Sequence, residues 1–193
     1  MGRPREFDTD EALNAAIQVF WLKGYESTSM VDLMEAMDLH KGSIYKAFGD
    51  KHQLFMSALG HYMSVGSTHL KSMMESAESP TEAIRSFLYM ALTECTCGPV
   101  AKGCLMMNSV VELAPHDEDV KALIGNFMEG AKRQISAVIS RGQALGEFRT
   151  DKSGDELADY VMNVKAGLLT AGKMDIRTSD PETIIEMTLQ AIA

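Results

Sequence analysis

The sequence has few of the features that membrane and secreted proteins need. It contains no run of about 18 apolar residues, so no membrane-spanning helix and no membrane partner are expected. The N-terminal stretch MGRPREFDTDEALNAA lacks the apolar segment of a signal peptide, which predicts a cytoplasmic protein. Three cysteines in 193 residues are too few for a secreted disulfide scaffold.

Positive charge is also scarce. The chain has 18 Lys and Arg against 27 Asp and Glu, a net charge of −9 at pH 7. Such a total disfavours nonspecific binding to nucleic acid. The basic residues are nevertheless gathered locally, because Lys41, Lys46 and Lys51 lie close together and Arg3 and Arg5 stand in the N-terminal arm. A local basic footprint on an acidic chain predicts DNA binding that depends strongly on salt.

The alternating pattern of β-strands is absent, and apolar residues recur at helical spacing instead. With 46% hydrophobic residues the chain can bury a substantial core. These features predict an all-α fold of about nine helices. Their expected ranges are about 9–23, 29–37, 41–48, 51–77, 80–96, 102–113, 116–145, 155–174 and 181–193.

The segment Thr28–Lys51 has the pattern of two short helices joined by a tight turn. Thr28 or Ser29 is expected to cap the first, since either side-chain oxygen can accept from orphan backbone N–H groups. Its predicted apolar side is Val31, Leu33, Met34 and Met37, and that of the second helix is Ile44 and Phe48. The other face of the second helix carries Lys41, Ser43, Tyr45 and Lys46, which suit phosphates and base edges. This arrangement predicts a helix-turn-helix reader of DNA.

The sequence resembles the tetracycline-repressor (TetR/AcrR) family of bacterial transcription regulators. The resemblance rests on GRPRE at residues 2–6, AIQVFWLKGYESTS at 16–29 and KGSIYKAFGDKHQLF at 41–55. It implies a homodimer that binds a palindromic double-stranded DNA operator, usually as a repressor. It also implies a helix-turn-helix DNA-binding domain in residues 1–52 and a helical bundle for ligand sensing and dimerisation in residues 53–193.

Individual contacts are implied by the same resemblance. Thr28 and Lys51 correspond to residues that bind phosphate, and Tyr45 to one that touches the DNA backbone. Lys46 occupies a variable position that reaches base or phosphate. The resemblance further implies that Lys41, Gly42 and Ser43, at the start of the recognition helix, approach base edges. It also implies that Arg3 and Arg5 belong to a basic arm that lies along the minor groove.

Residues from about 60 to 193 are expected to hold a small-molecule effector. Most of the fifteen methionines lie there, and methionine adapts its shape to permissive pockets. The alternative is that methionine fills irregular gaps between helices. The last two predicted helices are the expected dimer face, and the alternative is that they pack within one subunit.

The three cysteines, Cys95, Cys97 and Cys104, cluster around Gly98-Pro99. Cys104 is expected at a helix start near Lys102, where the thiol pKa would fall and favour the thiolate. One interpretation is a thiol sensor at Cys104 with Cys95 or Cys97 as its resolving partner. The other is that Cys104 is a small buried hydrophobe. The spacing does not match a zinc site, so no metal is expected.

An alternative function is a helical small-molecule-binding protein or enzyme that retains the N-terminal fold without binding an operator. The sequence contains no Gly-rich phosphate loop, HExxH motif or Ser-His-Asp spacing. A non-enzymatic regulator without a cofactor is therefore the preferred interpretation.

Overall fold

The computed structural model describes residues 7–96, 102–173 and 180–193, with only the backbone described for 94–96. These ranges hold helices and no strand, which confirms the all-α prediction. None of the described helices is long and apolar enough to cross a membrane. The helices, in chain order, are α1 (Thr9–Lys23), α2 (Met30–Met37), α3 (Lys41–Phe48), α4 (Lys51–Ser76), α5 (Pro80–Thr96), α6 (Leu105–Glu112), α7 (Glu118–Leu145), α8 (Gly154–Lys173) and α9 (Pro181–Ile192).

The helix ends follow local chemistry. The side chain of Asp50 caps α4 by accepting from the Gln53 N–H at 2.8 Å, and Gly24 ends α1 at a φ of +79°, as the sequence predicts. The expected helix over about 102–113 is shorter at its start. Gly103 has a φ of +65°, which lies in the left-handed region, so α6 begins only after Cys104.

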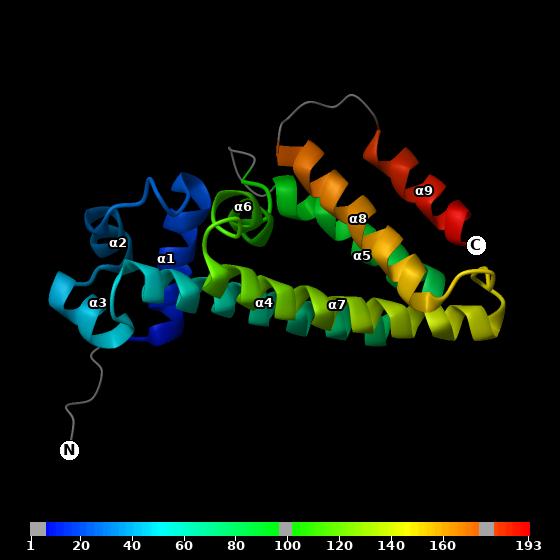
Figure 1. Cartoon of the computed structure of the whole chain (residues 1–193), viewed down its shortest axis with the longest axis horizontal. Coiled ribbons are helices and arrows are strands. Elements are labelled where there is room, and N and C mark those ends of the chain that lie inside the picture. Colours follow the sequence, from blue (N-terminus) through cyan, green and yellow to red (C-terminus); the bar gives the residue numbers. More distant parts are fainter. Residues whose placement is uncertain (1–6, 97–101, 174–179) are drawn as a thin grey trace, which may run out of the picture.

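Helix α4 links the two ends of the molecule (Figure 1). It packs against α1 and α3 on one side of this link and against α5, α6 and α7 of the bundle. Leu54, Phe55 and Leu59 are buried in the first half, and Leu70 and Met74 in the second. Helices α7 and α8 pack against each other, and α9 lies against α5 and α8 at the end opposite α2 and α3. The short helices α1–α3 are therefore held at one end of a helical bundle.

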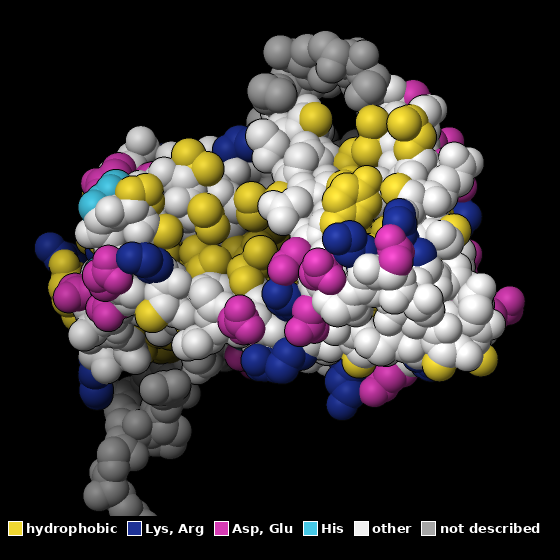
Figure 2. Space-filling view, turned by 45° about the vertical axis from the view of Figure 1, so that its right-hand side comes forward, with side chains coloured by type: hydrophobic (Ala, Val, Ile, Leu, Met, Phe, Trp, Pro, Cys, Tyr) yellow, Lys and Arg dark blue, Asp and Glu magenta, His cyan; other side chains and the backbone are white. Residues whose placement is uncertain are grey.

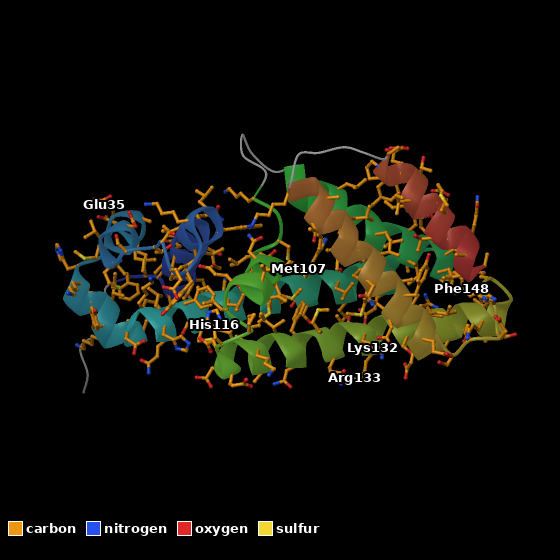
Figure 3. The ribbon with its side chains drawn as sticks, turned by 45° about the horizontal axis from the view of Figure 1, so that its top comes forward. Glu35, Met107, His116, Lys132, Arg133 and Phe148 are labelled. Carbon is orange, nitrogen blue, oxygen red and sulfur yellow. The ribbon has the colours of Figure 1, made fainter. Side chains whose placement is uncertain are left out.

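The turn after α7 depends on a close approach at Gly142. A Cβ built at this position would collide with the ring of Phe148 and meet the Pro80 Cβ at 3.0 Å. Phe148 is 4% exposed and lies beside the C-terminal end of α7 (Figure 3). The absence of a side chain at Gly142 thus lets Phe148 fold back onto α7 and close that end of the bundle.

We expect Gly142→Ala to lower the free energy of unfolding by about 1–3 kcal/mol, because the added methyl overpacks the site. Gly125→Ala is the matched control on the same helix, where a Cβ meets nothing within 4 Å. This control should stabilise the protein by about 0.5–1 kcal/mol through helix propensity. Urea unfolding of both variants checks the pair, and equal effects of the two substitutions would contradict the assigned packing.

Candidate nucleic-acid interface and adjoining cavity

Helices α2 and α3 form the helix-turn-helix pair. Leu33 and Ile44 are fully buried and Met37 is 7% exposed, so the inner faces match the expected apolar sides. Val31 departs from the prediction, being 59% exposed. The physical reason is helix geometry: at about 100° per residue, position 31 lies on the opposite side of α2 from position 33.

The start of α2 is fixed by a capping box. The Ser29 hydroxyl accepts from the Asp32 N–H at 3.2 Å, and the Asp32 carboxylate accepts from the Ser29 N–H at 2.9 Å. Asp32 also receives a 2.6 Å hydrogen bond from the Lys23 ammonium at the end of α1. The Lys23 hydrogen bond, followed by the Ser29 N–H, lowers the pKa of Asp32 to about 2. This ionised carboxylate therefore ties the end of α1 to the start of α2.

Thr28 has a different role from the expected phosphate contact. Its side chain is 2% exposed, and its hydroxyl donates to the Gly24 carbonyl at 2.5 Å. The only hydroxyl proton is thus used inside the turn between α1 and α2. Ser29, not Thr28, caps α2.

The outward face of α3 presents the other residues expected to touch DNA. Lys41, Tyr45 and Lys46 are exposed, with the Lys41 ammonium 5.6 Å from the centre of the Tyr45 ring. A Cβ at Gly42 would meet nothing within 4 Å, so the backbone there is open to a partner. Ser43 is half-buried on the first turn. Arg3 and Arg5 lie outside the described residues.

Lys51 extends this face from the first position of α4. Its ammonium lies 4.4 Å from the centre of the Tyr25 ring, a cation–π contact. Tyr25 in turn packs on Phe20 and Phe55, with ring centroids at 6.2 and 5.0 Å. Burial, and then the nearby carboxylates of Glu26 and other acids, raises the pKa of Tyr25. A neutral Tyr25 therefore positions Lys51 against the core of α1 and α4.

A cavity of about 460 Å³ lies behind this unit, and its volume is in the range of small-molecule sites. A hollow with hydrophobic side chains in its floor is visible in the middle of the face in Figure 2. Residues of α1 reach the cavity as well as those of α4–α8. The lining includes Asn14, Gln18, Trp21, His61, Tyr62, His69, Phe87, Cys104, Phe127 and Lys165, and the methionines Met63, Met90, Met106, Met107, Met128 and Met162.

Cys104 lies between this cavity and a second pocket. The second pocket shares Trp21, Cys104 and Met107 with the first and is bordered by Lys102 and Lys173. Cys104 is 6% exposed, and its sulfur lies 3.6 Å from the Tyr62 hydroxyl oxygen. Cys104 is the N-cap residue of α6, so it lies at a helix start as the sequence predicts. The side chain of Cys95 and all of Cys97 lie outside the described residues.

Several polar contacts join the N-terminal helices to the bundle, and the sequence alone predicts none of the three described next. The Trp21 indole N–H donates to the Gly103 carbonyl at 2.9 Å. The Glu112 carboxylate, at the end of α6, accepts from the N–H groups of Tyr25 and Glu26. These partners are separated by more than 80 residues, and no local sequence signal joins them.

The third contact is between His52 Nε2 and a carboxylate oxygen of Asp117, at 2.8 Å. The hydrogen bond from the Val120 N–H lowers the pKa of Asp117. Burial raises it, and the hydrogen bond with His52 lowers it further. Ligand atoms of His52, Asp117 and Asp119 lie within 4.8 Å of one another. Because Asp117 already caps α7 and pairs with His52, this cluster is assigned to structure and no metal is proposed.

A helix-turn-helix pair with an outward basic face, held at one end of a helical bundle, defines a DNA-binding protein. The family model for bacterial regulatory proteins of the tetR family matches residues 12–58, and that for the tetracyclin repressor-like C-terminal domain matches residues 80–188. The chain therefore belongs to the TetR family. It is a DNA-binding transcriptional regulator and not an enzyme, so the alternative of a non-binding relative is set aside.

Similar proteins agree with this assignment. The HTH-type transcriptional repressor ComR of Escherichia coli (strain K12) is 28% identical over 86% of this chain and 80% of its own. The HTH-type transcriptional regulator YezE of Bacillus subtilis (strain 168) is 27% identical over the whole of both chains. A cysteine mutant of the TetR family regulator CifR, complexed with 26-bp double-strand operator DNA, is 31% identical over both whole chains, with a TM-score of 0.83. The reduced form of E. coli NemR shares the fold, with a TM-score of 0.85 and 18% identity over 95% of this chain and 96% of its own.

The stabilising effect of Asp32 should depend on pH with a defined sign. Because its pKa is lowered from 3.8 to about 2, the contribution of the ionised form is complete above pH 3.8 and is lost as the pH falls through about 2. We therefore expect Asp32→Asn to lower the melting temperature at neutral pH, and the gap to wild type to close in that acid range.

Thermal unfolding followed by circular dichroism from neutral to acid pH measures this gap. Glu35→Gln is the control, since Glu35 is an exposed acid on the outer side of the same helix (Figure 3). A difference between wild type and Asp32→Asn that stays constant across the acid range would show that the carboxylate charge is not the cause.

Proposed function

We propose that the protein is a homodimeric repressor that binds a palindromic operator and leaves it when an effector occupies the cavity or Cys104 is modified. Residues 1–52 form the DNA-binding domain in this proposal, and residues 53–193 sense the ligand and dimerise. The observation that carries the proposal is the cavity wall, because Asn14, Gln18 and Trp21 of α1 share it with the sensing helices. An occupant would thus touch the DNA-binding domain itself. The repressor ComR supports the proposed output.

The proposed DNA contacts divide by chemistry. The start of α3 approaches base edges through Lys41, Gly42 and Ser43, where the backbone is open. Tyr45, Lys46 and Lys51 bind the phosphate backbone, with Lys46 also within reach of bases. Arg3 and Arg5 extend the contact into the minor groove. Thr28 leaves the set, since its hydroxyl is used inside the turn.

We expect Lys51→Ala to weaken binding to specific and nonspecific DNA alike. A lost phosphate contact lowers the slope of log affinity against log salt by about 1. Fluorescence anisotropy across a salt series measures affinity and slope together. Lys71→Ala is the matched control, since Lys71 is an exposed lysine farther along the same helix. Unchanged affinity and slope for Lys51→Ala would remove Lys51 from the DNA contact.

A homodimer is proposed through the outer surfaces of α8 and α9. Val161, Leu168 and Ile185 are buried within the subunit, so these parts of the expected face serve the monomer. Tyr160 and Met187 remain 44% and 60% exposed. Gly167 and Ala171 are exposed small residues on α8 that permit close approach. Two helices from each subunit would make a four-helix interface, whose two-fold symmetry matches a palindromic operator.

The thiol route is supported by the position of Cys104 in the wall shared by two pockets. The similar CifR structure is of a cysteine mutant, and the similar NemR structure is of a reduced form. The alternative, a small buried hydrophobe, is supported by the 6% exposure of Cys104. Reactivity distinguishes the two.

We expect a thiol alkylator, N-ethylmaleimide, to release operator DNA from the wild type but not from Cys104→Ser. The added group would occupy the cavity wall and displace α6. Electrophoretic mobility shift after treatment measures release, and mass spectrometry identifies the modified cysteine. Equal release from both proteins would assign the response to another thiol and leave Cys104 as a core residue.

A further inference from the structure

At the end of α6, the Glu112 side chain is hydrogen-bonded to the turn between α1 and α2. The two carboxylate oxygens of Glu112 accept separately, one from the Tyr25 N–H at 3.1 Å and the other from the Glu26 N–H at 2.9 Å. Hydrogen bonds to a charged acceptor are stronger than neutral ones, and two of them fix direction as well as distance. A Cβ at Gly24 would lie 3.0 Å from both carboxylate oxygens, so the left-handed Gly24 allows this close approach.

The turn that Glu112 binds is next to the residues that face DNA. The Tyr25 ring lies beneath the ammonium of Lys51, and it packs on Phe55 at the base of α4. Three residues beyond Glu26, Ser29 caps α2. Holding the Tyr25 and Glu26 backbone therefore sets the position of Lys51 and the start of the helix-turn-helix pair.

The other end of α6 forms the cavity wall. Cys104, Met106 and Met107 line the cavity, and α6 is only eight residues long. Met107 lies on α6 between the N-terminal helices and the bundle (Figure 3). A displacement of these residues by an occupant is carried to Glu112 within about two turns of rigid helix. One short helix thus touches both the proposed effector and the DNA-binding domain.

We propose that Glu112 is the positioning residue that holds the three-helix unit in its operator-competent arrangement, and that occupancy of the cavity acts by withdrawing it. The second half of this inference rests on the proposed effector role of the cavity. When the carboxylate is withdrawn, the turn is no longer held, so a smaller fraction of molecules has the three-helix unit in the operator-competent arrangement. Apparent operator affinity falls in proportion to that fraction.

Glu112→Ala in the full-length protein tests the first half. We expect operator affinity to fall about tenfold, a loss typical of charged hydrogen bonds. The direction of the change in affinity is informative, because removal of a negative charge alone would strengthen binding to DNA. Glu118→Ala, at the exposed start of α7, removes the same charge without touching the turn and should bind the operator at least as well as wild type. Unchanged or tighter binding by Glu112→Ala overturns the proposal.

Amide hydrogen exchange separates positioning from general destabilisation. The amides of residues 25 and 26 should exchange faster in Glu112→Ala while the amides of buried α4 positions keep their protection. Glu112→Gln retains one carbonyl oxygen and should give intermediate exchange and affinity. Unchanged exchange at both amides contradicts the proposed grip, and a uniform rise across the chain assigns Glu112 to global stability instead.

A cavity-filling substitution replaces the unknown effector in the second half of the test. Ala166 lines the cavity from α8, so Ala166→Phe supplies a permanent occupant, and Ala131→Leu from α7 is the alternative if that variant misfolds. We expect Ala166→Phe to weaken operator binding about tenfold in the wild-type background and by less than about twofold in Glu112→Ala, which is the non-additivity of coupled sites.

The outcomes distinguish the two proposals. Equal effects of Ala166→Phe in both backgrounds overturn transmission through Glu112 while leaving the cavity as a regulatory site. No effect of either filling substitution in the wild-type background counts against the cavity as effector site, and with it against withdrawal of Glu112 by an occupant. The affinity and amide exchange of Glu112→Ala still decide its positioning role.

Discussion

The packing of Phe55 against Phe20 is the contact on which the rest of the arrangement depends. Their rings meet edge to face, with centroids 5.0 Å apart, and the two residues are 2% and 1% exposed. The contact fastens α1 to the first half of α4, whose second half belongs to the bundle. Any change in the tilt of α4 therefore moves the helix-turn-helix pair. A movement of the bundle can reach the helix-turn-helix pair without a hinge, because α4 is packed into both parts.

Electrostatics complement this mechanical link. The chain carries a net charge of −9, yet the outer face of α3 and the start of α4 present lysines. Two acids near this face are engaged in structure, Asp32 with Lys23 and Asp50 with the first turn of α4. The basic patch is thus not neutralised locally, while the acidic remainder repels other DNA. Both features make affinity sensitive to how the patch is placed.

The sequence predicted what local chemistry determines. Caps at Asp50 and Gly24 and the buried faces of Leu33 and Ile44 follow from hydrogen bonding and helix periodicity. Val31 was misplaced, since an apolar residue type was taken for an inward direction that its position on the helix excludes. The family motif does not show that the Thr28 hydroxyl donates to the Gly24 carbonyl inside the turn.

Tertiary contacts explain the remaining gaps. The entry of α1 residues into the cavity and the grip of Glu112 join positions that are far apart in the chain, so a single sequence gives no signal for them. A methionine-rich lining was one of two interpretations of the methionine content, and the cavity itself arises from how α1 and α4–α8 are arranged. The thiol at the start of α6 was predicted from spacing, and its place between two pockets was visible only in the fold.

We infer that the DNA-binding face and the cavity wall move as one unit through α6. The most direct measurement is amide hydrogen exchange of the full-length protein with and without operator DNA. We expect slower exchange on operator binding in α3, in the turn at residues 24–28 and also in α6, which lies behind the DNA-binding face. Protection confined to α1–α3, with α6 unchanged, would contradict it.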